Sequence, residues 1–251
     1  MKLGCHAVLF KDKIATDTQN VLNRLAQTGF QGAEMGARFF GMERQAELAA
    51  ALQSAGIELS ALHIGMPTAM WAENPEQARG IVRQAALFVK GIPCKNLMMS
   101  GQVCDNLPLV AKNINLAAEE CLESGVVLNY HNHKGEFDND AEMYKILREQ
   151  APSLFFGFDL GWVRKGGYDI YRALEENQGR VGYVHVRDCG DDRESHEFPD
   201  LGSGNEDLKK LMAYLSGYLP ADGWAVVEYE TGEENFERYD TAYRYLQTLM
   251  G

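Results

Sequence analysis

Eight short apolar segments alternate with amphipathic helical segments along the 251 residues, and this alternation predicts an α/β protein with the (β/α)8 TIM barrel fold. Successive strands are spaced by roughly thirty residues, which suits such a barrel. A doubly wound open sheet is the competing fold, but no GxGxxG turn follows the first predicted strand. No low-complexity linker or charge block divides the chain, so we expect one domain over residues 1–251.

The predicted strands are apolar runs that end at polar residues, Gly or Pro. The fifth leads directly into the sequence Asn129 to Phe137, which holds two imidazoles and a carboxylate. Because residues two apart on an extended backbone point the same way, His131 and His133 are expected to share a face. In chain order, the strands are expected at residues 3–10, 32–35, 57–64, 96–99, 126–128, 154–158, 181–186 and 224–229.

The predicted helices follow from the 3.6-residue period and from end signals. The helix over residues 18–28 stops at Gly29, and the next stops at Gly56. A third begins with Asn74 as its cap and Pro75 in its first turn. In order, the helices are expected at residues 18–28, 43–55, 75–90, 109–124, 141–150, 170–176, 208–219 and 236–250.

Composition limits the classes of partner. The formal charge of −12 and the pI near 5.0 argue against nucleic acid or an anionic membrane, since both require clustered Lys and Arg. The five Cys form no CxxC pair, which is typical of reduced thiols. With no apolar signal core and no run of about 18 apolar residues, we expect a cytoplasmic protein.

Polar residues gather where the predicted strands end, which is where chemistry concentrates in such barrels. Singly, each could cap a helix or face water, and Asp188 could simply orient a loop. The last four strands, however, each present a carboxylate or an imidazole, which an apolar strand seldom buries unpaired. The full set is Glu34, His63, His131, His133, Glu136, Asp159, His185, Arg187, Asp188, Glu228 and Glu230.

A divalent metal would account for this set. Mixed imidazole and carboxylate ligands suit Mn²⁺, Co²⁺, Fe²⁺, Ni²⁺ or Zn²⁺ better than an all-oxygen cage of Mg²⁺ or Ca²⁺. The identity of the ion, Mg²⁺ included, stays open. Such an ion could hold two neighbouring substrate oxygens and stabilise the enediolate formed when a proton leaves the carbon between them.

Five motifs resemble, in the right order, the sugar phosphate isomerase/epimerase group with the xylose isomerase-like barrel, which includes inosose dehydratases. The resemblance covers nearly the whole chain. Its motifs are YHNH with EF at residues 130–137, DLGWV with GG at 159–167, HVRD at 185–188, LGSG at 201–204 and VEYE at 227–230.

The resemblance implies a metal held by a Glu, an Asp, a His and a Glu from strands five to eight. Asp159, His185 and Glu228 occupy the last three places. In the first place, where many members have Glu-Asn-His, this chain has His131-Asn132-His133. Either His131 is therefore the ligand or Glu136 reaches in from the following loop.

The resemblance also suggests roles for the other candidates. Glu228, Glu136 and His133 are the expected catalytic residues. Arg187, Trp162, His63 and Glu34 are the expected substrate-binding residues, with Arg187 on an oxygen or phosphate and Trp162 stacked on a sugar face or packed in the core.

The leading hypothesis is a divalent-metal-dependent isomerase or epimerase of a small keto- or aldo-sugar. The first alternative is a lyase like inosose dehydratase, which removes water from a cyclic polyol ketone. Endonuclease IV shares the barrel but needs a basic groove and more His than the six present. A sugar-binding protein without metal is a further alternative. The expected partner is a small carbohydrate, and the oligomeric state, a homo-oligomer among the options, stays open.

Overall fold

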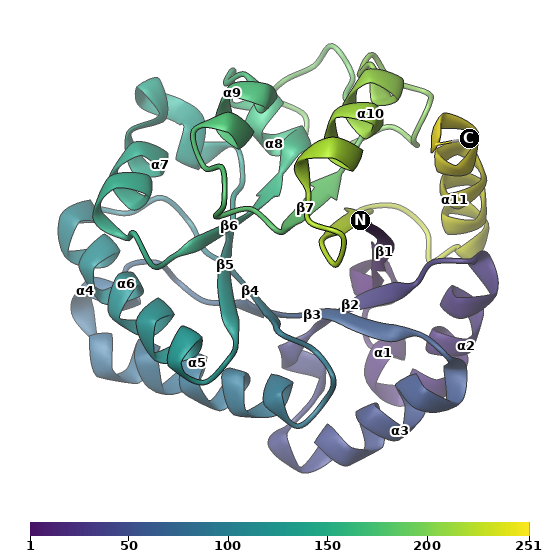
Figure 1. The fold of residues 1–251 in the computed structure, drawn as a ribbon, viewed down its shortest axis with the longest axis horizontal. Coiled ribbons are helices and arrows are strands. Elements are labelled where there is room, and N and C mark those ends of the chain that lie inside the picture. Colours follow the sequence, from purple (N-terminus) through teal and green to yellow (C-terminus); the bar gives the residue numbers. More distant parts are fainter. Residues whose placement is uncertain (251) are drawn as a thin grey trace.

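A closed barrel of eight parallel strands forms the centre of the computed structural model, which describes residues 1–250 (Figure 1). Each strand pairs with the next in sequence, and β1 pairs with β8 to close the barrel. The predicted (β/α)8 fold is confirmed. The strands are β1 (Lys2–His6), β2 (Gly32–Gly36), β3 (Glu58–Gly65), β4 (Asn96–Ser100), β5 (Val127–His131), β6 (Phe155–Asp159), β7 (Tyr183–Val186) and β8 (Trp224–Val227).

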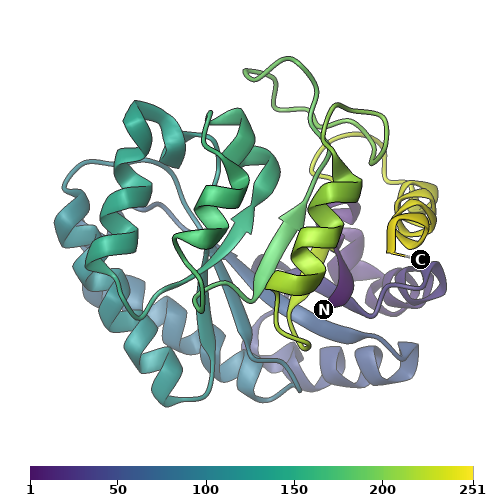
Figure 2. The same ribbon diagram turned by 45° about the horizontal axis from the view of Figure 1, so that its top comes forward.

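Helices surround the barrel on its outside (Figures 1 and 2). The longer ones are α2 (Thr18–Thr28), α3 (Gln45–Ala55), α5 (Pro75–Lys90), α6 (Leu107–Glu123), α7 (Asp138–Gln150), α10 (Leu208–Tyr218) and α11 (Phe236–Met250). The shorter ones are α1 (Lys13–Thr16), α4 (Met70–Glu73), α8 (Leu160–Lys165) and α9 (Ile170–Glu175), with 3₁₀ turns at Ala7–Phe10, Ala37–Phe39, Met42–Arg44 and Gly135–Phe137. None of the helices within residues 1–250 combines the length and the apolar character needed to cross a membrane.

The first strand is shorter than predicted. It ends at His6, and Ala7–Phe10 forms a 3₁₀ turn that buries Leu9 and Phe10. A short apolar segment can form either a buried strand or a buried turn, so hydrophobicity alone does not predict where this strand ends. In the structure the strand ends at His6.

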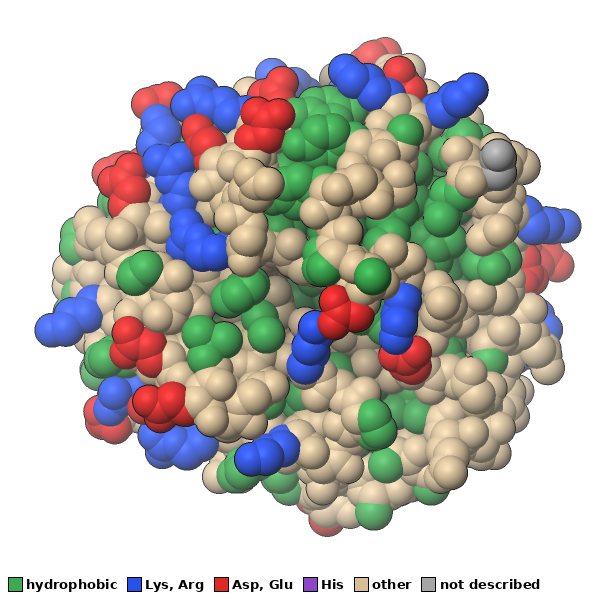
Figure 3. Space-filling model, in the orientation of Figure 1, with side chains coloured by type: hydrophobic (Ala, Val, Ile, Leu, Met, Phe, Trp, Pro, Cys, Tyr) green, Lys and Arg blue, Asp and Glu red, His purple; other side chains and the backbone are tan. Residues whose placement is uncertain are grey.

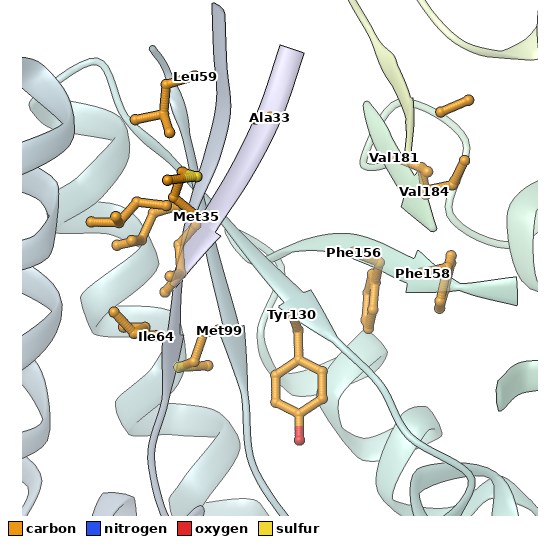
Figure 4. Packing of buried hydrophobic residues seen from close by; sticks show 14 of the residues in the cluster. Ala33, Met35, Leu59, Ile64, Met99, Tyr130, Phe156, Phe158, Val181 and Val184 are labelled. Atoms are coloured by element: carbon orange, nitrogen blue, oxygen red, sulfur yellow. The ribbon is translucent and has the colours of Figure 1, made fainter. Parts of the chain in front are cut away.

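The main hydrophobic core lies between the barrel and its helices, and Figure 4 shows part of it. The rings of Phe156 and Phe158 are stacked with centroids 5.0 Å apart, and both meet Tyr144 of α7 edge-on. Aromatic pairs in this geometry add about 0.5–1.5 kcal/mol each beyond the burial of their area. This packing fixes β6, and therefore the position of Asp159 at its end.

A separate apolar cluster fills the inside of the barrel toward the strands' N-terminal ends. It consists of Ala61, Met98, Tyr183, Trp224 and Val226. The indole of Trp224 takes up space that Gly32 leaves, since a Cβ on Gly32 would lie 2.5 Å from the ring. We call these five residues the barrel plug.

The opposite end of the barrel carries the loops that follow the strands. Figure 2 shows the connection from β7 to α10 extending beyond the barrel. On the face in Figure 3, basic and acidic side chains are interspersed, without a broad patch of either sign.

Candidate metal centre

Strand register brings the polar residues at the ends of the strands together. His6 lies opposite Glu34 in the β1 and β2 pair, and Asp159 lies opposite His185 in the β6 and β7 pair. Glu228 directly follows β8. These five side chains are all buried, although a buried ionisable group must be paired or bound to an ion to be tolerated.

Four of the expected ligands form one compact group. His131, Asp159, His185 and Glu228 each offer a donor atom, and these atoms lie within 4.8 Å of one another. None of the four residues is more than 2% exposed. The group combines two imidazoles with two carboxylates, a donor set suited to a first-row divalent metal.

Several buried atoms of this group have no hydrogen-bond partner among the described residues. They are Nδ1 of His131, Nδ1 of His185 and Oε2 of Glu228. Glu228 Oε2 lies 2.9 Å from His185 Nδ1 and 2.7 Å from Arg187 Nη2, but neither contact has the angles of a hydrogen bond. Because unpaired buried polar atoms are costly, these lone pairs fit a cation held between them.

His131, and not Glu136, belongs to this group. The Glu136 carboxylate accepts hydrogen bonds from the Tyr130 hydroxyl at 3.0 Å and from the His133 backbone N–H at 2.9 Å. It is 2% exposed, and it does not line the cavity that His131 and Glu228 line. Glu136 thus holds the loop after β5 in place. In this position its carboxylate does not face the cavity, as the expected catalytic role would require.

Arg187 is an internal counter-ion to the carboxylates. Its guanidinium contacts Asp159 through Nε at 2.6 Å, and through Nη2 it contacts Glu228 at 2.7 Å and Glu230 at 2.8 Å. Only 3% of Arg187 is exposed. The guanidinium of Arg187 was expected to contact a substrate oxygen or phosphate. In this geometry it instead contacts three carboxylates of the protein.

Trp162 lies in the core, the second of its two expected placements. It is buried against Phe198, whose ring meets the indole edge-on with centroids 4.7 Å apart. The backbone N–H of Trp162 donates to Asp159 Oδ1, which caps α8. The backbone of Trp162, and not its indole, therefore contacts Asp159.

Glu34 is the centre of a second network. Its Oε1 lies 2.6 Å from His63 Nδ1, and its Oε2 lies 2.6 Å from His185 Nε2. His6 stands between the two carboxylates, with Nδ1 2.6 Å from Glu228 Oε1 and Nε2 3.7 Å from Glu34 Oε1. His6 ends β1 but was absent from the predicted set of site residues.

The electrostatic environment shifts the pKa values of the two imidazoles of the four-residue group in opposite directions. Burial and the neighbouring His185 hold the pKa of His131 well below its usual 6.5. Burial disfavours the charged form of His185 too, but Glu34 and Glu228 raise its pKa well above 6.5. Near neutral pH the surroundings therefore favour the neutral form of His131 and the protonated form of His185.

The Glu228 carboxyl stays ionised despite its burial. Burial favours the neutral form, but Arg187 and His185 hold the pKa of Glu228 well below its usual 4.5. Glu228 is therefore a carboxylate at neutral pH, as both a ligand and a base require.

The group opens into a cavity of about 630 Å³, a size suited to a small ligand. His131, His133 and Glu228 line its inner part, together with His6 and His63. Arg38 and Phe39 line the wall that follows β2. Polar groups therefore converge on one side of a pocket that also has apolar walls.

The loop after β7 is organised by Asp188. Its carboxylate accepts hydrogen bonds from the backbone N–H groups of Cys189, Gly202, Gly204 and Glu206. Lys165 holds the outer part of the loop by donating to the carbonyls of Ser195 and Glu197. These contacts match the loop-orienting role considered for Asp188. The glycines of the LGSG motif allow the backbone to come close to the Asp188 carboxylate.

A family model described as the xylose isomerase-like TIM barrel matches residues 22–249. The chain belongs to this family. The resemblance inferred from the five motifs is thereby confirmed. The described residues lie at the C-terminal ends of the strands, where TIM barrels generally carry their chemistry.

Among its relatives in the family is inosose dehydratase of Geobacillus kaustophilus, which is 27% identical over 247 residues, covering 84% of this chain and 79% of the relative. A sugar phosphate isomerase/epimerase from Parabacteroides distasonis has a similar structure, with a TM-score of 0.77, 18% identity and coverage of 98% of this chain and 93% of that one. The 3-keto-D-glucoside 4-epimerase from E. coli superposes with a TM-score of 0.76 at 15% identity, covering 99% of both chains. The relatives are enzymes, and the structural similarities establish the shared fold.

Proposed function

We propose that this protein is a divalent-metal-dependent enzyme that removes a proton next to the carbonyl of a small polyhydroxy aldehyde or ketone, and that it acts as a sugar isomerase or epimerase. One observation carries the proposal: four buried donors from successive strand ends converge beside a cavity of sugar size. The names of the relatives support this class of substrate.

His131, Asp159, His185 and Glu228 would hold the ion. A divalent ion in this place supplies a Lewis acid that stabilises negative charge on substrate oxygen. Asp159 is held for this role by the Trp162 N–H and by Arg187. His185 is oriented by the hydrogen bond between its Nε2 and Glu34, which leaves Nδ1 facing the group.

Glu228 is the proposed base. Its carboxylate lines the cavity and is ionised at neutral pH. It would take the proton from the carbon between two substrate oxygens and return it to the neighbouring carbon, which converts an aldose to a ketose or the reverse. His133 lines the same cavity and would bind a substrate hydroxyl.

A second candidate function is dehydration of a cyclic polyol ketone. The two carboxylates that line the cavity, Glu228 and Glu230, both follow β8, whereas Glu136 faces away. Two-base epimerisation needs bases on opposite faces of the substrate, so this arrangement favours chemistry with one carboxylate base. An imidazole such as His133 would then give a proton to the departing hydroxyl.

The test is a substrate screen with metal-loaded protein. Aldoses, ketoses and cyclic polyol ketones are incubated in D₂O with Mn²⁺ or Co²⁺. Deuterium incorporation without water loss supports the isomerase or epimerase, and growth of an enone absorbance band supports the lyase. Protein that holds no divalent metal, and that Mn²⁺ and Co²⁺ do not stabilise thermally, would contradict both.

A further inference from the structure

We propose that His6, Glu34 and His63 form a second site for a divalent metal ion, on the β1 to β3 side of the cavity. The ligand atoms are His6 Nε2, Glu34 Oε1 and His63 Nδ1, and the donor atoms of these three residues lie within 4.8 Å of one another. This site goes beyond the proposed function, which needs one ion held by strands β5 to β8.

The second polar atom of each ligand is already held by another group. His6 Nδ1 lies 2.6 Å from Glu228 Oε1, and His63 Nε2 lies 2.9 Å from Ser100 Oγ. These bonds place the remaining nitrogen of each ring toward Glu34. Imidazoles that bind metals in proteins typically donate their other N–H in this way, which fixes the tautomer and the ring orientation.

One carboxylate oxygen of Glu34 is likewise held by neighbouring groups, which leaves the other for the ion. Its Oε2 accepts a hydrogen bond from the Tyr183 hydroxyl at 2.7 Å and contacts His185 Nε2 at 2.6 Å. Oε1 faces the two imidazoles of the proposed site. The Glu34 side chain is fully buried, so a cation between its Oε1 and the two imidazoles would be favourable in addition to the contact of Oε2 with His185.

The ring arrangement favours a metal over protons as that cation. His6 is stacked on His63 with centroids 5.4 Å apart, and on His185 with centroids 5.7 Å apart. Protonating adjacent stacked rings would place like charges face to face. A single ion between His6, His63 and Glu34 neutralises the carboxylate while both rings stay neutral.

The ligand set indicates the class of ion and its use. Two imidazoles and one carboxylate form a set typical of Zn²⁺ and non-haem Fe²⁺ sites that keep coordination positions open. His6 and His63 line the cavity, so the open positions would face it. The ion would bind a water molecule or a second substrate oxygen there.

The two sites should fill in order. The first group offers four donors and the second offers three, so the first ion should bind more tightly. Titration of chelator-treated protein with Zn²⁺ or Co²⁺ by calorimetry, with elemental analysis of the loaded protein, should give two ions per chain.

Two imidazole variants locate the second ion. His63→Ala should lower the count from two ions to one. His133→Ala is the matched control, because His133 lines the same cavity but belongs to a different potential group with His131 and Glu230. It should keep two ions. One ion in saturated wild-type protein, or a second ion lost in His133→Ala but kept in His63→Ala, would overturn the inference.

Ser100→Ala provides a milder change if His63→Ala does not fold. It removes only the hydrogen-bond partner of His63 Nε2. It should lower the affinity for the second ion by about 10- to 100-fold and leave the affinity for the first ion unchanged. Equal affinity of both ions in this variant and in the wild type would contradict the site. A protein that binds no ion contradicts the proposed function as well, whereas one ion insensitive to His63→Ala contradicts only this inference.

Discussion

His6 Nδ1 lies 2.6 Å from Oε1 of Glu228, across the seam where β1 and β8 close the barrel. The first strand thus supports the carboxylate that the last strand supplies. Glu228 also contacts Arg187 and His185 through its other oxygen. Its position is therefore determined by three side chains from two neighbouring strand ends.

Glu228→Gln should remove turnover and leave the fold intact. The amide keeps the size of the side chain but cannot take a proton, and a positioned base is worth about 10²- to 10⁴-fold in rate. Steady-state kinetics and circular dichroism check both parts. Turnover equal to that of the wild type would show that Glu228 is not the base.

His131→Ala and Glu136→Ala should separate metal binding from loop stability. His131→Ala should lose most of the affinity for the first ion, since it removes one of four donors. Calorimetric titration with Mn²⁺ or Co²⁺ measures this loss. Unchanged affinity would exclude His131 as a ligand.

Glu136→Ala should keep metal affinity and lower the free energy of unfolding. It leaves the buried Tyr130 hydroxyl and the His133 N–H without their acceptor, which costs roughly 1–3 kcal/mol for each unpaired group. Urea unfolding measures the difference. A large loss of metal affinity in this variant would instead restore Glu136 as the first ligand.

The contact between Glu34 and His185 should make the stability of the metal-free protein depend on pH. The pKa of Glu34 is held well below 4.5, because His185 and His6 outweigh the effect of its burial. Its contribution is present above pH 4.5 and is lost as the pH falls through the lowered pKa. The pKa of His185 is raised well above 6.5, so its contribution is complete below pH 6.5 and is lost as the pH rises through the raised pKa.

The two contributions overlap between pH 4.5 and 6.5. Glu34→Gln should therefore destabilise the metal-free protein most in this window, by roughly 3–5 kcal/mol, the usual cost of breaking a buried ion pair. The difference should shrink toward alkaline pH. Urea unfolding of chelator-treated wild type and variant at pH 5.5 and pH 9 tests this, and an equal difference at both values would argue against the ion pair.

Gly32→Ala should destabilise the barrel near its N-terminal end. The new Cβ would lie 2.5 Å from the Trp224 ring, and such overpacking costs roughly 1–3 kcal/mol. Gly182→Ala is the matched control, because nothing lies within 4 Å of a Cβ there. Thermal unfolding should separate the two variants, and equal melting temperatures would contradict the predicted clash.

The barrel was predictable because it depends on pattern, whereas the candidate ligands were assigned through the resemblance to the family's motifs. The period of the strands and helices identified the fold, and strand ends converge in any such barrel. Asp159 and His185 could therefore be named without knowing any distance. The same reasoning placed Glu228 beside them.

Features that depend on side-chain direction were not predictable. Glu136 lies a few residues beyond His131, and only the 3₁₀ turn Gly135–Phe137 directs its carboxylate toward Tyr130. Arg187 follows β7 and could have faced the cavity, but three carboxylates hold it inside. His6 lies at the end of β1 but was not among the predicted site residues.

The barrel plug fills the barrel beneath the proposed active-site cavity. None of the plug residues, Trp224 and Tyr183 among them, belongs to the cavity lining, which extends from the strand ends toward the loops. In the proposed reaction, a compound that reaches Glu228 would therefore leave toward the loops and not through the plug. Product still bound there obstructs the next substrate molecule, so the two should compete for the free enzyme, and the rate of product departure will set how quickly the site becomes available again.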